Sequence, residues 1–247
     1  MKNPVSNLKF KQYLYQKLAI KGNSPKTAAG FTLIEMLVVA LMIGIIAVIA
    51  APGWLGFVEQ RRANKANDVV LGAIQEAQSQ AKNKKVSYSI SVRTKDRVPA
   101  IAVYQAKRSD PVNPDKQIDV KPNDLSDSEW RSLGQDLDLR PGQIWLGTNA
   151  ANSNNAGNDK IQAAPDNGVT VVTFDYMGAL QVTPNAPTPN LGSKSQGLII
   201  AVAATKSDDP NAPNPVTRRC VKVSTLIGSI QAGKIDSTGP TDECKPI

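Results

Sequence analysis

The N-terminal third of the chain passes from a polar segment to a wholly apolar run and then to an amphipathic pattern. Residues 1–28 are polar and rich in lysine, whereas residues 36–58 form a run of 23 positions without a charged side chain. A run of this length is enough for a helix that crosses a bilayer with some tilt. Glu35 stands directly before the run. Since a plain membrane anchor has no need of a carboxylate there, Glu35 is a candidate functional residue.

The segment from Glu59 to Lys84 has the period of a helix with one buried face. Its apolar residues recur every three or four positions, at Ala66, Val69, Ala73, Ile74, Ala77 and Ala81. Together with the apolar run, this segment predicts one helix from Phe31 to Asn83, roughly 80 Å long at 1.5 Å per residue. Pro52 lacks an amide hydrogen and clashes with the preceding turn, so we expect a kink near Gly44 and Pro52. The alanine-rich face is expected to pack on a sheet.

After residue 85 the pattern alternates between apolar and polar residues, which is typical of half-buried strands. The candidate strands are 86–92, 100–106, 144–146, 169–175, 179–182, 197–204, 218–225 and 229–235, with a tight turn at Met177 and Gly178. Stretches rich in Pro, Asn, Asp and Gly separate them, at about 109–127, 148–168, 184–196 and 206–215. Because these stretches lack aromatic anchors, we expect most of them to be mobile solvent loops; the alternative is that they are insertions that meet a partner.

The residues G-F-T-L-I-E at 30–35, followed by the apolar run, resemble the processing site of the type IV prepilins. In that family a prepilin peptidase cuts after the glycine and methylates the new N-terminal amine. The resemblance implies cleavage after Gly30, a mature chain that begins at N-methylated Phe31, and Glu35 as the fifth mature residue, with a role in subunit assembly. Gly44 and Pro52 match positions where the family helix carries a glycine and a proline.

A secretory signal peptide or a plain anchor is the alternative interpretation of the N-terminal segment. Ala50 and Ala51 are small residues that could follow the apolar region of such a signal. That interpretation leaves Glu35 and the long polar leader without a purpose, so we favour the prepilin motif.

Two segments in the C-terminal half resemble a narrower group, the minor pilins of the pseudopilin H and FimT/FimU type. Val171 to Leu180 contains an F-x-x-x-G strand and turn, and Arg218 to Ser224, followed by Gly228, is similar to the last strand and turn of that group. The resemblance covers about 31–82 and 169–234. It implies an α+β pilin fold, in which a long N-terminal helix packs against an antiparallel β-sheet.

The same resemblance divides the chain into four parts. Residues 1–30 are expected to be a leader that is removed on maturation, 31–58 the transmembrane and filament-core half of the helix, and 59–84 its amphipathic half. Residues 85–247 are expected to form an extracytoplasmic β-rich domain with long loops.

The function that the resemblance implies is that of a minor pilin, a structural subunit that helps to initiate or cap a type IV pilus used in motility, adhesion or DNA uptake. A minor pseudopilin of a type II secretion system is one alternative. The implied partners are a prepilin peptidase, other pilins or pseudopilins that contact the N-terminal helix, and an inner-membrane assembly platform.

A DNA-binding pilus receptor for natural transformation is the second alternative, and DNA as a partner is not favoured. Some members of the group bind DNA through a G-R-x-R turn, but here the turn reads Gly228-Ser229-Ile230-Gln231. Four basic residues stand nearby: Arg218, Arg219, Lys222 and Lys234. We expect Arg218 and Arg219, which begin the strand, to lie on an exposed face.

The formal charge of +8 belongs mostly to the leader. Residues 1–30 hold six lysines and no acid, which leaves 23 basic and 21 acidic residues in the rest. A positive N-terminus favours a cytoplasmic location for that end, and a near-neutral remainder argues against an electrostatic DNA site. Before assembly we expect a single-pass protein of the inner (plasma) membrane with its N-terminus in the cytoplasm. After assembly we expect it in a periplasmic or cell-surface filament.

The chain contains no histidine, which excludes Ser-His-Asp and Cys-His catalysis and all histidine metal sites. Asp236, Asp242 and Glu243 could hold Ca²⁺, yet scattered acids in such a segment are usually solvated. We therefore expect no enzymatic activity, no cofactor and no metal.

Two cysteines, Cys220 and Cys244, can form a disulfide outside the cytoplasm, with two free thiols or a metal pair as alternatives. A disulfide that closes this loop would stabilise the folded state by roughly 3–4 kcal/mol in the chain-entropy model. A C-terminal disulfide loop also resembles many pilins.

The implied mechanism is assembly rather than catalysis. An ionised Glu35 is costly in lipid unless it is paired, and the amine of Phe31 is cationic at neutral pH with or without methylation. The amine of one subunit can therefore neutralise Glu35 of its neighbour in a medium of low dielectric. Gly30 is needed because the peptidase must reach a backbone without a side chain.

Overall fold

The structure is a computed structural model of the 247-residue chain. It describes residues 30–110, 112–134, 139–182, 188–192, 196–206, 208–209 and 211–246, without the side chains of residues 50–52. The chain divides into two compact units, Met1–Ala51 and Pro52–Ile247, and each unit is described by itself.

The main helix, α2 (Leu33–Lys84), is 52 residues long and agrees with the predicted helix to within two residues at each end. Thr32 caps it, because its hydroxyl oxygen accepts the N–H of Glu35 at 3.2 Å. Lys82 and Lys84 lie in its last turn, where positive charge is favourable, and Lys85 leaves the helix with φ 57°.

Two antiparallel sheets make up the C-terminal region. The four-stranded sheet has the order β5 (Arg131–Ser132), β2 (Val98–Gln105), β1 (Tyr88–Lys95), β8 (Val169–Phe174). The six-stranded sheet has the order β12 (Glu243–Pro246), β11 (Ile230–Asp236), β10 (Arg219–Val223), β9 (Leu198–Ala204), β6 (Ile144–Thr148), β7 (Gln162–Ala163). A separate hairpin joins β3 (Lys107–Ser109) and β4 (Gln117–Asp119), and short 3₁₀ turns are η1 (Pro122–Asp124), η2 (Asp127–Glu129) and η4 (Pro215–Thr217).

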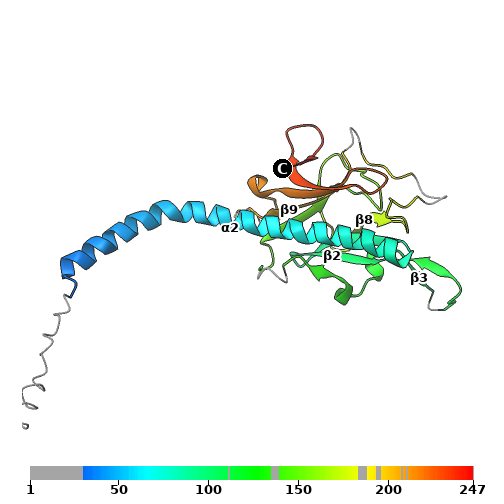
Figure 1. The fold of residues 1–247 in the computed structure, drawn as a ribbon, viewed down its shortest axis with the longest axis horizontal. Helices are drawn as coiled ribbons and strands as arrows, with labels where there is room; N and C mark the ends of the chain where they lie inside the picture. The colour runs from blue at the N-terminus through cyan, green and yellow to red at the C-terminus, as the bar shows by residue number, and fades with distance from the viewer. Residues whose placement is uncertain are drawn as a thin grey trace, which may run out of the picture. The chain divides into compact units, whose positions relative to one another are not determined.

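The alanine-rich face of α2 packs against both sheets and forms the central core. The helix residues that belong to this core are Ala66, Val70, Ala73, Ile74, Ala77 and Ala81, so Val70 takes the place expected for the half-buried Val69. They meet Ile90 and Ile101 of the four-stranded sheet and Val202 and Val221 of the six-stranded sheet. Figure 1 shows the cyan half of α2 running across the strands. Small side chains on α2 allow the sheets to approach the helix backbone closely. This arrangement confirms the predicted α+β fold.

Polar side chains of α2 hydrogen-bond to the sheets and their loops beside this smooth face, and we call these contacts the polar ties. The pairs are Glu59 with Asn214 (3.2 Å), Asn64 with Arg219 (2.6 Å), Glu76 with Arg131 (2.8 Å), and Gln78 with the carbonyl oxygens of Gly178 (2.8 Å) and Gly228 (2.9 Å). Alanine side chains are too short to interlock firmly with the sheets. The polar ties therefore help to set the register of the helix on the sheets.

The outer face of each sheet is covered as well. Over the four-stranded sheet, Val120, Leu125 and Trp130 pack on Ala102 and Tyr104. Over the six-stranded sheet, a second cluster contains Ile199, Ala201, Cys220 and Cys244, with Trp145 packed against it. This explains why every residue of β9 is buried: the strand has a covered surface on both faces.

The predicted strand at 179–182 is wrong. Only Leu180 forms a bridge, to Phe174, because the intervening residues make a tight turn. The Asp175 carboxylate closes that turn by accepting the N–H groups of Met177 and Ala179 at 2.9 and 3.0 Å. The N–H of Leu180 then turns away from β8 and donates to the carbonyl of Leu226 at 2.8 Å.

The segment 148–168 is not the solvent loop expected of most such stretches, because two asparagines bond it to the sheets. Asn149 is fully buried and bonds to Gly197 O and Ile199 N, each at 2.8 Å. Asn154 is 5% exposed; its carboxamide accepts the N–H of Thr173 at 2.8 Å and donates to Thr173 O at 3.0 Å. The asparagines thus supply the hydrogen bonds that a neighbouring strand would make.

Candidate functional site

The N-terminal unit presents the residues of the predicted processing site in an accessible conformation. Gly30 and Phe31 are exposed and precede the helix, and the Phe31 side chain is 77% exposed. Thr32 and Glu35 stand at the spacing of a capping box, which is a sequence signal for the helix start that the apolar pattern alone does not supply. The described cap uses only the backbone N–H of Glu35, and the Glu35 side chain lies exposed in the first helical turn.

The helix that follows is apolar on every side. The large apolar side chains of the described part of this unit are each 43–83% exposed, and they are Phe31, Leu33, Ile34, Met36, Leu37, Val38, Val39, Leu41, Met42, Ile43, Ile45, Ile46, Val48 and Ile49. An apolar surface that surrounds a helix is stable only in lipid or against other apolar surfaces. This part of the helix therefore needs lipid or other apolar surfaces to cover its side chains.

By length and composition, no single helix within the described ranges qualifies as a membrane span, but the segments Leu33–Ile49 and Gly53–Lys84 do so when they are taken together as a bent pair. Gly44 lies on the helix with nothing within 4 Å of the position that a Cβ would take. The kink predicted near Gly44 and Pro52 stays a prediction, since the side chain of Pro52 is not among those described.

The two turns that carried the second resemblance lie together at the C-terminal end of α2. Gly178 and Gly228 have φ of 80° and 78°, and a Cβ on Gly228 would stand 2.5 Å from the carbonyl oxygen of Gly178. Gln78 bonds to both glycine carbonyls through one side-chain nitrogen. Gln78 cannot be singled out from the sequence, because its role depends on backbone groups 100 and 150 residues further along the chain.

The four basic residues near the last turn do not form an exposed basic surface, so the expectation that Arg219 lies on an exposed strand face is wrong. Arg219 is 4% exposed and lies under α2, where its Nε donates to Asn64 Oδ1 at 2.6 Å. Burial lowers the pKa of its guanidinium. Arg218 is half-buried and donates to Ser237 Oγ at 2.8 Å, which leaves Lys234 as the exposed cation of the set and Lys222 half-buried.

The disulfide expected between Cys220 and Cys244 is present, with a Cα–Cα distance of 5.9 Å. It links β10 to β12 across the outer face of the six-stranded sheet, where both sulfur-bearing residues are buried. The bond therefore fastens the edge strand β12 to the interior of the sheet.

The acidic residues near this disulfide are engaged separately, and the expectation that they are solvated is wrong for Asp242. Asp242 is 5% exposed, accepts the N–H of Ile161 at 2.8 Å and pairs with Lys160 at 3.3 Å. Asp236 pairs with Lys245, and Glu243 lies on β12. Among the described residues, no group of three or more His, Cys, Asp or Glu side chains is arranged to hold a metal ion.

The surroundings of Asp242 favour its charged form. Burial by itself raises the pKa of a carboxyl group, but the hydrogen bonds from Ile161, Ser237 and Lys160 outweigh burial and lower the pKa of Asp242 below its usual value. In addition, Gln196 donates to the carbonyl oxygens of Asp159 and Asp242 at 3.1 and 2.9 Å. Asp242 thus anchors the disulfide loop to the segment that contains Lys160 and Ile161.

The comparisons with known proteins concern the N-terminal segment. Residues 25–51 match the family model described as the prokaryotic N-terminal methylation motif, and this span contains Gly30, Phe31, Glu35 and Gly44. No curated protein and no solved structure gives a match to the chain. The chain thus carries the methylation motif of type IV prepilin-like proteins, which supports a structural pilin or pseudopilin, processing by a prepilin peptidase, and an N-terminal anchor that later enters a filament.

Proposed function

We propose that the chain is a minor pilin, a structural subunit that helps to initiate or cap assembly of a type IV pilus. The observation that carries the proposal is the methylation motif at residues 25–51, which leads into a helix with exposed apolar side chains on every face. Such a helix needs lipid before assembly and neighbouring helices afterwards. One surface can serve both states, because lipid tails and aliphatic side chains are equally apolar.

In this proposal the prepilin peptidase removes residues 1–30 and methylates Phe31. Residues 31–58 then form the part of the helix that enters the filament core, and residues 59–84 support the β-rich domain at 85–247. An exposed, non-helical backbone at Gly30 and Phe31 supports cleavage there, since a protease requires an extended and accessible chain. The assembly platform of the inner membrane would receive the processed subunit.

The assembly step in the proposal is a charge pairing between subunits. Glu35 is exposed in the first turn of α2 and has no salt-bridge partner among the described residues. In an apolar filament core a lone carboxylate is strongly unfavourable, whereas a carboxylate beside the cationic amine of a neighbouring Phe31 is neutralised. The pairing thus draws an incoming helix into a single axial register.

The narrower assignment to the minor pilins of the pseudopilin H and FimT/FimU type is supported by the C-terminal turns. The F-x-x-x-G turn at Phe174 to Gly178 and the turn at Gly228 are bonded to the same residue of α2, Gln78. Burial of Arg219 and the side-chain bond of Arg218 argue against DNA reception as the principal role.

Mass spectrometry of sheared surface filaments, compared with the membrane fraction, tests the proposal. We expect a peptide that begins at N-methylated Phe31 in the filaments, in small amounts relative to the major subunit. The same peptide confined to membranes would instead support a minor pseudopilin of a type II secretion system. A chain that begins near Pro52, or one that is unprocessed, would overturn the proposal.

Gly30→Val is the test variant, and it should abolish the Phe31 N-terminus because a branched side chain at the cleaved bond obstructs the peptidase. Gly44→Ala is the matched control, since a Cβ at Gly44 meets nothing within 4 Å in the described structure. It should be cleaved normally.

A further inference from the structure

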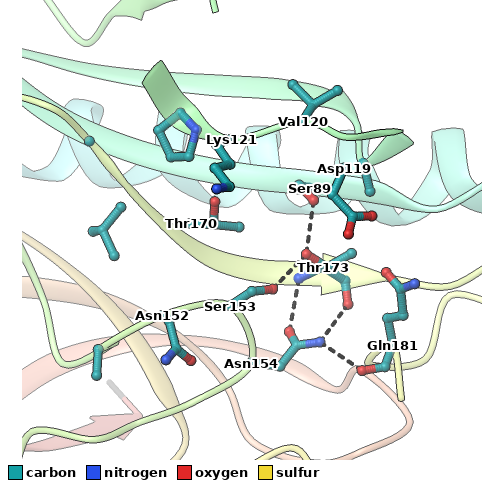
Figure 2. Close-up of a pocket in the computed structure, with 15 residues that line it drawn as sticks. Ser89, Asp119, Val120, Lys121, Asn152, Ser153, Asn154, Thr170, Thr173 and Gln181 are labelled. Carbon is teal, nitrogen blue, oxygen red and sulfur yellow. Dashed lines mark hydrogen bonds between the residues drawn. The ribbon is translucent and has the colours of Figure 1, made fainter. Parts of the chain in front are cut away.

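A pocket of about 430 Å³, lined by both polar and apolar groups, opens on the outer face of the four-stranded sheet, apart from the helix and its motif. Ser89 of β1 and Thr170 and Thr173 of β8 line it, together with residues 119–122 and residues 151–154. Figure 2 shows these hydroxyl groups between the two segments, which we call the upper wall (119–122) and the lower wall (151–154). The volume lies within the range of small-molecule sites.

One set of hydroxyl groups beside this pocket, of which only Thr170 lines it, is fully engaged. Ser91, Tyr104 and Thr170 form a closed triangle, with oxygen–oxygen distances of 2.8, 3.0 and 3.0 Å. Each hydroxyl carries one hydrogen, so three hydrogens serve three hydrogen bonds. This triangle therefore satisfies itself and has a structural role.

A second set, beside the first, is not satisfied internally. Thr173 Oγ1 lies 2.8 Å from Ser89 Oγ and 2.6 Å from Ser153 Oγ, and these three hydroxyl groups form an open chain. Two hydrogen bonds use two of the three hydrogens, whichever group donates. One O–H donor of the chain consequently has no acceptor among the described residues and is available to water or to a ligand in the pocket.

The lower wall is held in place before any ligand arrives. Besides its bonds to Thr173, Asn154 donates to Gln181 O at 3.1 Å, and its backbone N–H donates to Val171 O at 3.0 Å. These bonds occupy the free edge of β8, so an extended peptide cannot add to the sheet at this place. The pocket is thus a preformed site for a compact ligand.

The groups that face the pocket indicate the chemistry of that ligand. They combine hydroxyl donors and acceptors with the amides of Asn152 and Gln181 and one charge of each sign, Asp119 and Lys121. A phosphate site would need several cations, whereas a polyhydroxylated ligand uses paired donors and acceptors with no net charge. Val120, Pro122 and Ala151 supply apolar contacts for the carbon skeleton of such a ligand.

We propose that this pocket binds a neutral saccharide of one or two sugar units. The spare O–H of the Ser89–Thr173–Ser153 chain, the Asn152 amide and the Lys121 ammonium would hydrogen-bond to sugar oxygens. This binding role rests on the β-domain alone and does not depend on the assembly function.

Saturation-transfer difference NMR on the full-length chain, in a detergent without a sugar headgroup, tests the proposal. The probes are lactose, maltose and N,N′-diacetylchitobiose at millimolar concentrations. We expect at least one of them to show saturation transfer. Absence of transfer to all three disaccharides would overturn the proposal.

Two single variants locate the binding. Asn152→Ala and Lys121→Ala remove exposed side chains that make no side-chain hydrogen bond to the described residues, so the fold should persist. Each should raise the Kd of the disaccharide that binds by at least fivefold. Lys206→Ala removes a similar charge from a residue that does not line the pocket, and it should leave the signal unchanged. Equal signals from all the variants would place the probe elsewhere and reject this site.

Discussion

The two parts of α2, residues 33–58 and residues 59–84, differ in the size of their apolar side chains and in what covers them. In the first part, large apolar side chains are exposed on all faces of the helix, up to Trp54, Leu55 and Phe57. In the second part, the apolar residues are mostly alanine, lie on one face and are buried by two sheets. Large side chains suit contact with lipid or with other helices, whereas small ones let a sheet approach the helix backbone. The first half depends on other molecules, and the second depends on the rest of its own chain.

The largest expected effect is a loss of filament incorporation without a loss of stability in the β-rich domain. Glu35→Ala should reduce the amount of the subunit in filaments at least tenfold, because the amine of the neighbouring subunit loses its counter-charge. Cleavage after Gly30 and the unfolding free energy of the β-rich domain should stay unchanged. Immunoblots of sheared filaments, with mass spectrometry of the N-terminus, provide the measurement. Normal incorporation of the variant would show that Glu35 is only an interfacial carboxylate.

The second prediction concerns the domain that depends on its own chain. Replacing both cysteines, in Cys220→Ala/Cys244→Ala, should lower the unfolding free energy by about 3–4 kcal/mol, because the unfolded chain loses its cross-link. Urea titration of the detergent-solubilised full-length chain, followed by tryptophan fluorescence, measures the change. Processing at Gly30 should continue as in the wild type. A change below about 1 kcal/mol would mean that the reduced domain keeps its fold by packing alone.

The third prediction tests the alanine face. Ala77 is fully buried, so Ala77→Leu should destabilise the domain by about 1–3 kcal/mol through overpacking. Gly72→Ala is the matched control on the same helix, since Gly72 is exposed and a Cβ there meets nothing within 4 Å. It should raise stability by up to about 1 kcal/mol through helix propensity. If both variants were neutral in urea titration, close packing of α2 on the sheets would be refuted.

The smallest expected effect depends on pH. The folded pKa of Asp242 is lowered, so its stabilising contribution is present above the unfolded pKa, about 3.9, and is lost as pH falls through the folded pKa. Asp242→Asn should therefore cost about 1–2 kcal/mol at pH 7 and progressively less below about pH 4. Urea midpoints of both proteins at pH 7, 5 and 3 measure the difference, in which the other acids cancel. A difference that stays constant with pH would contradict a role for the charge.

Much of the helix and the longer strands could be predicted from the sequence because their periodicity is a local property. The helix ends within two residues of the predicted positions, and β1, β2, β8, β9, β10 and β11 lie close to the candidate strands. β3, β5 and β7 are two or three residues long and carry polar or charged residues, too few for an alternating pattern. β12 contains a proline, and its place at the sheet edge follows from its pairing with β11 and the disulfide to β10.

The candidate site divides in the same way. Gly30, Phe31 and Glu35 are recognised by local spacing, which a sequence displays directly. The roles of Gln78, Asn154 and Asp242 depend on backbone groups far away in the chain, since each bonds to N–H or C=O groups that only the folded topology brings near. Polar residues in a loop or on a helix are ordinarily solvated, so nothing in the sequence distinguishes these three from their neighbours.

The polar ties between α2 and the sheets have a mechanical consequence. A pull along the helix axis would have to slide an almost smooth alanine face across the strands. The ties are attached at Glu59, Asn64, Glu76 and Gln78, which are spread along the helix. Because they act at several points along the helix, they would share the load. The β-rich domain should therefore stay attached to its helix when the helix is under tension.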